Sequence, residues 1–310
     1  MTTRAPGDEP FGPGAAVSLT ATYRSLAVVT DAGAPLGSWE KYGSGLRADA
    51  ALIHTLSGVR TVPLSLIARD AAELAEKLHG LPPDVGTIFL TRTNRARTRD
   101  AQRLLTGLGG RPLITDDDAV AITLTAAVWN YLIRRRRPLT GSRVLIAGAA
   151  ALPVISPMLL TAGILDITLW NRRDADQAPL SRVTRDADVV VDLVGPAAGM
   201  DQVSLDRPIG SVIGLDQERD HLLALPGLSL ALAAAPAPTV NVEVLCACAR
   251  GLVSATPPHH RLPVLSSPDT TDAVTAAALL VLNGVVAPPA SGSAWPSRFR
   301  CEERDHPGQR

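Results

Sequence analysis

Lys41 and Tyr42 are the adjacent pair of side chains in this sequence best suited to proton transfer. Of the 30 basic residues only Lys41 and Lys77 are lysines, so few positions could hold a catalytic lysine. General acid–base chemistry needs titratable groups within hydrogen-bond reach of the reacting atoms. We expect the pair to lie in a loop between Gly37 and Leu46. The simpler alternative is an ordinary surface loop with no chemical role.

A second candidate site is the stretch from Arg143 to Arg173, whose pattern indicates a strand, a small-residue turn, an apolar helix and a second strand. This unit binds dinucleotides when its turn carries glycines spaced as G-x-G-x-x-G. Gly148, Ala150 and Pro153 hold those positions here, so only the first glycine is present. Alanine lets the backbone approach a pyrophosphate less closely than glycine, so weak nucleotide binding is expected.

The residues after the second strand indicate which nucleotide would fit. Asn171 stands where an acidic side chain would bind the ribose hydroxyls, and Arg172 and Arg173 follow it. A neutral residue followed by basic ones favours the 2′-phosphate of NADP over NAD. A solvated loop with two ordinary arginines is an equally good interpretation. The candidate cofactor-binding residues are Gly148, Ala149, Ala150, Asn171 and Arg172.

Strand and helix patterns alternate along the chain, which is typical of a parallel α/β layer. Strand-like runs occur at residues 25–31, 59–66, 85–90, 112–114, 144–146, 166–170, 189–194 and 209–215. Residues 116–137 predict a long apolar helix, because three aspartates open it and four arginines close it, in agreement with the helix dipole. Residues 241–253 fit either a helix or a strand.

The order of these patterns predicts two α/β domains. Residues 11–138 form the first, and residues 139–287 form a Rossmann-like domain with a doubly wound parallel sheet. Residues 1–10 and 288–310 lack an apolar pattern, and we expect them to be a disordered lead and a disordered tail.

The bulk composition argues against several kinds of partner. Lys+Arg and Asp+Glu both number 30, so no overall charge favours nucleic acid or a membrane surface. Cys246, Cys248 and Cys301 fit neither a disulfide framework nor a zinc site. The first ten residues lack the apolar segment of a signal peptide. The expectation is a reduced, cytoplasmic protein.

Six segments, taken in order, resemble the malic enzymes, which convert malate to pyruvate by oxidative decarboxylation. They are FGPG (11–14), AVVTDAGAPLG (27–37), ADAALIHTLSGVRTVPL (48–64), DVGTIFLTR (84–92), ITDDDAVAITLTAAVWNYL (114–132) and RVLIAGAAALPV (143–154). The resemblance implies a malic-enzyme-type N-terminal α/β domain followed by the Rossmann-like domain. It also implies NADP or NAD as cofactor and an oligomeric state.

The catalytic residues that the resemblance would place in this chain are mostly replaced. The general acid tyrosine of the family falls on Phe11, which has no hydroxyl group. Its general base lysine falls on Asp49, which carries the opposite charge. Lys41 and Tyr42 are the pair that could take over these two roles.

The metal ligands that the resemblance implies are replaced as well. The family's Glu-Asp pair falls on Thr91 and Arg92, and its third carboxylate on Asp116, with Asp117 and Asp118 as neighbouring alternatives. One carboxylate beside an arginine does not provide the oxygen ligands that Mg²⁺ or Mn²⁺ needs. No divalent metal is therefore expected.

We predict an ion pair between Arg92 and Asp116 in place of the metal. Such a pair could be purely structural, which we favour, or its guanidinium could grip the carboxylate of a small carboxylic acid. Asn241 matches a substrate-binding asparagine of the family. It could equally be an ordinary polar residue at the start of a helix or strand.

Two functions follow from these observations. The first is a malic-enzyme-like protein that has lost metal-dependent oxidative decarboxylation. It would act as a non-catalytic or regulatory subunit, as a homo-oligomer or together with an active relative. The alternative is a metal-independent, NADP-linked oxidoreductase or lyase that acts on a small carboxylic acid through Lys41, Tyr42, Arg92, Asp116 and Asn241.

Overall fold

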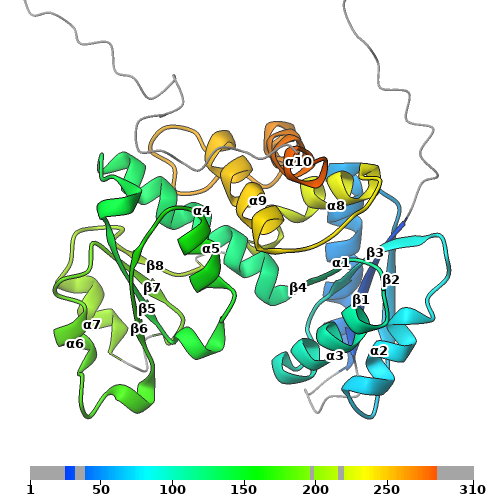
Figure 1. The fold of residues 1–310 in the computed structure, drawn as a ribbon, viewed down its shortest axis with the longest axis horizontal. Coiled ribbons are helices and arrows are strands. Elements are labelled where there is room, and N and C mark those ends of the chain that lie inside the picture. The colour runs from blue at the N-terminus through cyan, green and yellow to red at the C-terminus, as the bar shows by residue number, and fades with distance from the viewer. Residues whose placement is uncertain (1–24, 32–38, 196–198, 216–219, 285–310) are drawn as a thin grey trace, which may run out of the picture.

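A computed structural model describes residues 25–31, 39–195, 199–215 and 220–284 (Figure 1). The expected lead at residues 1–10, Phe11 and the expected tail at 288–310 lie outside the described residues, as do the side chains of Lys41 and Tyr42. In this part of the chain, no helix is both long and apolar enough to cross a membrane.

The first sheet is parallel and has the strand order β2-β1-β3-β4. Its strands are β1 (Ser25–Asp31), β2 (Thr61–Leu66), β3 (Val85–Leu90) and β4 (Leu113–Thr115). Leu26 and Val28 pack on the side of α1 (Trp39–Ser57). Ala27 and Val29 face α2 (Ala71–His79) and α3 (Arg95–Gly107). Helices on both faces explain why β1 and β3 are buried along their whole length.

The second sheet repeats this plan with the order β6-β5-β7-β8. Its strands are β5 (Arg143–Ala147), β6 (Asp166–Trp170), β7 (Val189–Asp192) and β8 (Val212–Ile213). Its helices are α5 (Ile155–Thr161), α6 (Leu180–Val183) and α7 (Met200–Leu205). Alternate residues of β5 pack on opposite faces, against α5 on one side and against α6 and α7 on the other. The predicted α/β fold with parallel, doubly wound sheets is confirmed.

Helix α4 (Asp116–Arg134) runs between the two sheets (Figure 1). Sixteen of its residues are buried, because both sheets and the C-terminal helices pack around it. Those helices are α8 (Leu225–Ala234), α9 (Val242–Ala255) and α10 (Pro268–Leu282). Helix α8 returns to the first sheet and contacts α1 and β3. One core therefore joins the two sheets, and the division of the chain at residue 138 stays a prediction.

The secondary structure of the described residues tests two local predictions. The predicted loop between Gly37 and Leu46 is wrong, because α1 already begins at Trp39 and includes Lys41 and Tyr42. Gly43 and Gly45 lower the helix propensity of this stretch, and the packing of α1 against the sheet outweighs that cost. The ambiguous segment from residue 241 is a helix, α9, whose N-cap is Asn241.

The two cysteines of α9 give a simple test of this packing. Cys246 and Cys248 are buried, and burial raises the pKa of both thiols, that of Cys246 to about 11. Because only the thiolate reacts readily, neither should react with a disulfide reagent at neutral pH in the folded chain. In a Cys301→Ser variant, thiol labelling should therefore appear only after denaturation. Rapid labelling of the folded variant would contradict this packing.

Candidate functional site

The candidate site lies where the first sheet meets α4. Thr91 and Arg92 directly follow β3, and Asp116 directly follows β4. These strands are parallel neighbours, so their carboxyl ends meet at one edge of the sheet. Helix α1 adds Asp49, which the structure places beside Arg92.

Arg92 forms its ion pair with Asp49. Its Nη2 lies 2.5 Å from Asp49 Oδ2, and the Asp49 side chain is 3% exposed. Gly45, one turn before Asp49, makes room for the guanidinium, because a Cβ there would lie 3.0 Å from Nη2. Arg92 has a φ of 51°, an uncommon backbone conformation for an arginine. The surrounding contacts must stabilise it there.

The predicted ion pair between Arg92 and Asp116 is therefore wrong in its partner. Asp116 instead accepts a hydrogen bond from the backbone N–H of Arg92, with 2.7 Å between N and Oδ2. The resemblance favoured Asp116, because it placed both Arg92 and Asp116 at metal-ligand positions of the family. Asp49 arrives from a separate helix, and only the packing of α1 on the sheet brings it to the guanidinium.

Asp116 and Arg92 each keep one polar atom unused. Asp116 Oδ1 and Arg92 Nη1 are buried, and neither has a hydrogen-bond partner among the described residues. Burial raises the pKa of Asp116, although hydrogen bonds from Thr91 and from the Arg92 backbone oppose the rise. Desolvation thus favours the protonated acid, the opposite of what a metal-binding carboxylate requires.

The three consecutive aspartates of α4 contact three different partners. Asp117 pairs with Arg95 and Arg99 of α3, at 3.2 Å in both cases. Asp118 Oδ2 accepts hydrogen bonds from the backbone and hydroxyl of Thr115, which closes a capping box at the start of α4. Within the described ranges, no group of three or more His, Cys, Asp or Glu side chains could hold a metal ion. The residues present do not fit a Mg²⁺ or Mn²⁺ site.

Asn241 has a structural role that the sequence left open. Its Oδ1 accepts a hydrogen bond from the Val244 backbone N–H at 2.9 Å, so it caps α9. No hydrogen bond between described residues joins Asn241 to Arg92 or Asp116. Capping uses one side-chain oxygen and leaves the amide NH₂ free to donate.

The turn after β5 keeps its one glycine for steric reasons. Gly148 has a φ of 92°, and a Cβ at this position would lie 2.8 Å from the Val194 side chain. Its N–H donates to the carbonyl of Trp170 on the neighbouring strand β6. Ala149 is buried beneath the turn, and Ala150 is exposed.

Asn171 and Arg172 bind parts of the protein itself. The Ala150 backbone N–H donates to Asn171 Oδ1 at 2.9 Å. Arg172 Nη2 donates to the carbonyl of Val194, at 3.1 Å. A helix N-terminus normally supplies the N–H groups for a pyrophosphate at this turn. Here α5 begins only at Ile155, beyond the turn, and lacks a side-chain cap.

The sequence did not indicate a role for Arg95 and Arg99. Both come from α3 of the first sheet, and both donate to the carbonyl of Ala151 in the turn after β5, at 3.3 and 2.9 Å. They therefore connect the two sheets at the edge where the candidate site lies. Arg95 also lines a pocket of about 250 Å³, together with Leu152 and Asp192. Arg95 and Arg99 are four residues apart, so both lie on one face of α3. This spacing was the signal in the sequence that could have indicated them.

Comparison with solved structures finds malic enzymes. The NAD-dependent malic enzyme of Thermotoga maritima superposes with a TM-score of 0.70 at 17% identity, over 84% of this chain and 85% of that one. The malic enzyme of Pyrococcus horikoshii gives 0.70 at 15%, over 86% and 78%. That of Entamoeba histolytica gives 0.64 at 15%, over 86% and 70%.

Sequence comparison gives no such match, because no protein-family model and no curated protein aligns with the chain. At these low identities the structural likeness shows the fold alone. The chain has a malic-enzyme-like fold, as the resemblance of its sequence segments implied.

Proposed function

We propose that this chain is a malic-enzyme-like protein that has lost metal-dependent oxidative decarboxylation and serves as a non-catalytic, regulatory subunit. The observation that carries the proposal is the ion pair between Arg92 and the buried Asp49. By the resemblance, this pair stands where the family has a metal ligand and a basic lysine. The two charges are exchanged, so the pair keeps the fold neutral while removing both functions.

The metal side of the proposal rests on charge. A divalent cation beside Asp116 would be repelled by the positive charge of Arg92, whose backbone N–H already occupies Asp116 Oδ2. Asp117 and Asp118 are committed to arginines and to the helix cap. Both carboxylates would have to leave these partners before they could bind a metal ion.

The cofactor side rests on the turn after β5. A pyrophosphate there would compete with Asn171 for the Ala150 N–H, and Arg172 already donates from one nitrogen to the Val194 carbonyl. One of the similar structures is described as an NAD-dependent enzyme. For this chain the residues around the turn support weak binding of NADP or NAD at most.

The alternative, a metal-independent oxidoreductase or lyase, draws less support from the same contacts. Arg92 is held by Asp49, and Asn241 caps α9. Lys41 and Tyr42 belong to a helix rather than to a mobile loop. Arg92 Nη1, which has no hydrogen-bond partner among the described residues, is a donor that would suit a carboxylic acid ligand.

A regulatory subunit needs a surface for its partner. Leu160, Leu165 and Leu169 are 49%, 66% and 54% exposed, within one stretch that ends on the edge strand β6. Exposed apolar patches are typical of interaction sites, and we propose that these three leucines contribute to one. Association with a second copy or with an active relative would cover them.

The loss of activity predicts two negative results and one positive one. The purified chain should not bind Mn²⁺ in a calorimetric titration, and it should not reduce NADP or NAD when malate is added. The variant Asp49→Lys/Thr91→Glu/Arg92→Asp restores the charges that the resemblance implies and should gain Mn²⁺ binding. Malate-dependent reduction by the wild type that a chelator abolishes would contradict the proposal.

The regulatory role is tested separately. The chain is expressed together with a malic enzyme of the same organism, and the mixture is analysed by size-exclusion chromatography and by its rate of malate oxidation. A joint elution peak with a changed rate is expected. If the chain elutes alone and the rate is unchanged, it is not a regulatory subunit of that enzyme.

A further inference from the structure

A large cavity lies in the second sheet, away from the candidate site. It has a volume of about 1040 Å³. Its lining includes Asp188, just before β7, and Arg207 and Pro208, which precede β8. It is therefore at the amino ends of these strands, whereas the candidate site lies at carboxyl ends. Its size is at the upper end of the range for pockets that bind small molecules.

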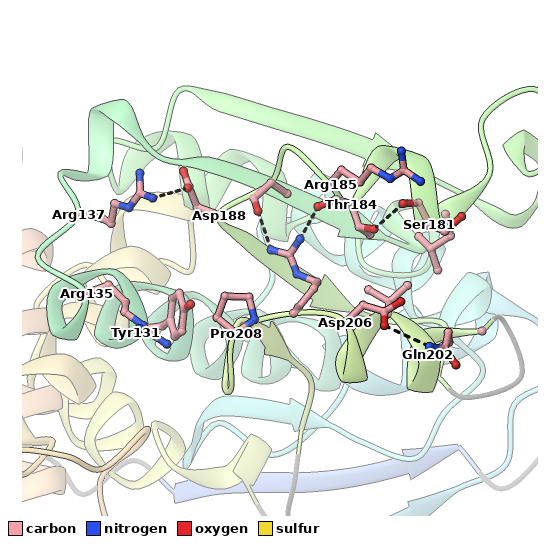
Figure 2. Close-up of a pocket in the computed structure, with 15 residues that line it drawn as sticks. Tyr131, Arg135, Arg137, Ser181, Thr184, Arg185, Asp188, Gln202, Asp206 and Pro208 are labelled. Carbon is pink, nitrogen blue, oxygen red and sulfur yellow. Dashed lines mark hydrogen bonds and ion pairs between the residues drawn. The ribbon is translucent and has the colours of Figure 1, made fainter.

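The lining carries an excess of positive charge. Arg135, Arg137, Arg185 and Arg207 face only two carboxylates, Asp188 and Asp206. Arg137 pairs with Asp188 at 3.3 Å, and Asp206 accepts a hydrogen bond from Gln202. In Figure 2, Arg135 and Arg137 lie on one side of the pocket, and Gln202 and Asp206 lie on the other.

Arg207 is the most constrained of these cations. Its guanidinium donates to the carbonyls of Thr184 and Ala187 and to the hydroxyl of Ser211, all neutral acceptors. Among the residues that the structure describes, no carboxylate lies within ion-pair distance of Arg207. Burial lowers the pKa of Arg207, so the desolvated cation would gain stability from a nearby anion.

Arg135 and Arg185 are also without an ion-pair partner in the described part of the chain. The Arg135 guanidinium lies 5.5 Å from the ring of Tyr131 and 3.5 Å from the Ile209 carbonyl oxygen. Arg185 is exposed at the rim. Tyr131, Leu180 and Pro208 add apolar surface to the same cavity. Guanidinium groups over an apolar floor suit an organic anion, because each oxyanion group can be bound bidentately.

We propose that this cavity binds a small polyanion that carries at least two carboxylate or phosphoryl groups. The anion would lie among Arg135, Arg185 and Arg207, away from Asp206. Tyr131 and Arg135 stand at the end of α4, whose first residue is Asp116. A ligand here would therefore contact the C-terminal end of α4. The candidate site lies at the other end of this 19-residue helix, which is on the order of 28 Å long.

The test uses the full chain and two probes, citrate for the carboxylate class and pyrophosphate for the phosphoryl class. Each is titrated calorimetrically at constant ionic strength. Saturable binding of one or both is expected, and the stronger one identifies the class. The variant Arg135→Gln/Arg185→Gln should weaken that binding about tenfold or more, because each lost charged hydrogen bond contributes strongly.

A matched control separates a specific site from general attraction. Arg136→Gln/Arg182→Gln removes the same charge from neighbouring positions that are exposed and do not line the cavity. It should bind the probe as the wild type does. Absence of binding by both probes would overturn the proposal, and so would an equal loss in the two variants. Thermal unfolding of all proteins checks that the substitutions leave the fold intact.

Discussion

Arg92→Ala is expected to lower the free energy of unfolding by about 3 kcal/mol, one of the largest single-residue effects in the chain. The substitution leaves the Asp49 carboxylate buried at 2% exposure without a counter-ion. A quarter of the Arg92 side chain is exposed, which places the effect at the low end of the range for buried pairs. Urea denaturation of the variant and the wild type measures the difference.

Arg60→Ala is the matched control for this prediction. It breaks another Arg–Asp pair, with Asp84, whose side chains are 71% and 52% exposed. Exposed pairs contribute up to about 1 kcal/mol, so this variant should remain close to the wild type. Adding Asp49→Asn to Arg92→Ala removes the orphaned charge and should restore much of the stability. Equal losses in Arg92→Ala and Arg60→Ala would show that the Asp49 pair is not the buried contact described here.

Gly251→Ala is expected to lower the free energy of unfolding by about 2 kcal/mol. A Cβ at Gly251 of α9 would lie 2.6 Å from the Cα of Val274 and 2.8 Å from the Ala273 carbonyl oxygen, both in α10. These are backbone atoms, so the two helices would have to move apart. Alanine favours a helix by about 1 kcal/mol over glycine, and overpacking outweighs this gain.

Gly107→Ala supplies the control for the Gly251 substitution. Gly107 ends α3, is exposed, and a Cβ there would meet no atom within 4 Å. Helix propensity alone should act at this position, and the variant should be as stable as the wild type or more stable by up to about 1 kcal/mol. If Gly251→Ala also proved neutral, the close contact between α9 and α10 would be refuted. Thermal unfolding of both variants and the wild type measures these differences in stability.

The alternation of strand and helix patterns was enough to predict the architecture. The apolar runs of β1, β3 and β5 indicated strands covered on both faces, which only a parallel sheet between helices provides. The three aspartates also indicated where α4 begins, and there Asp118 closes a capping box with Thr115. These signals are local, because the residues involved are neighbours along the chain.

The sequence did not predict the interaction partners of the site residues. The resemblance predicted that Asp49 and Arg92 stand in place of residues of opposite charge, and it led us to pair Arg92 with Asp116. In the fold, the guanidinium passes Gly45 and reaches Asp49, while Asp116 binds the Arg92 backbone. Arg92 also has a left-handed backbone conformation, with a φ of 51°, which no residue pattern predicts.

By itself, then, the sequence determined the α/β class and the malic-enzyme-like order of segments, and it led to the prediction that the chemistry of those segments is replaced. Only the tertiary structure decided that Asn171 ties the turn at Ala150, and that Arg95 and Arg99 bridge the two sheets. The physical reason is distance along the chain. Periodicity and capping act between near neighbours, whereas an ion pair or a cavity forms from side chains that meet only after the elements have packed.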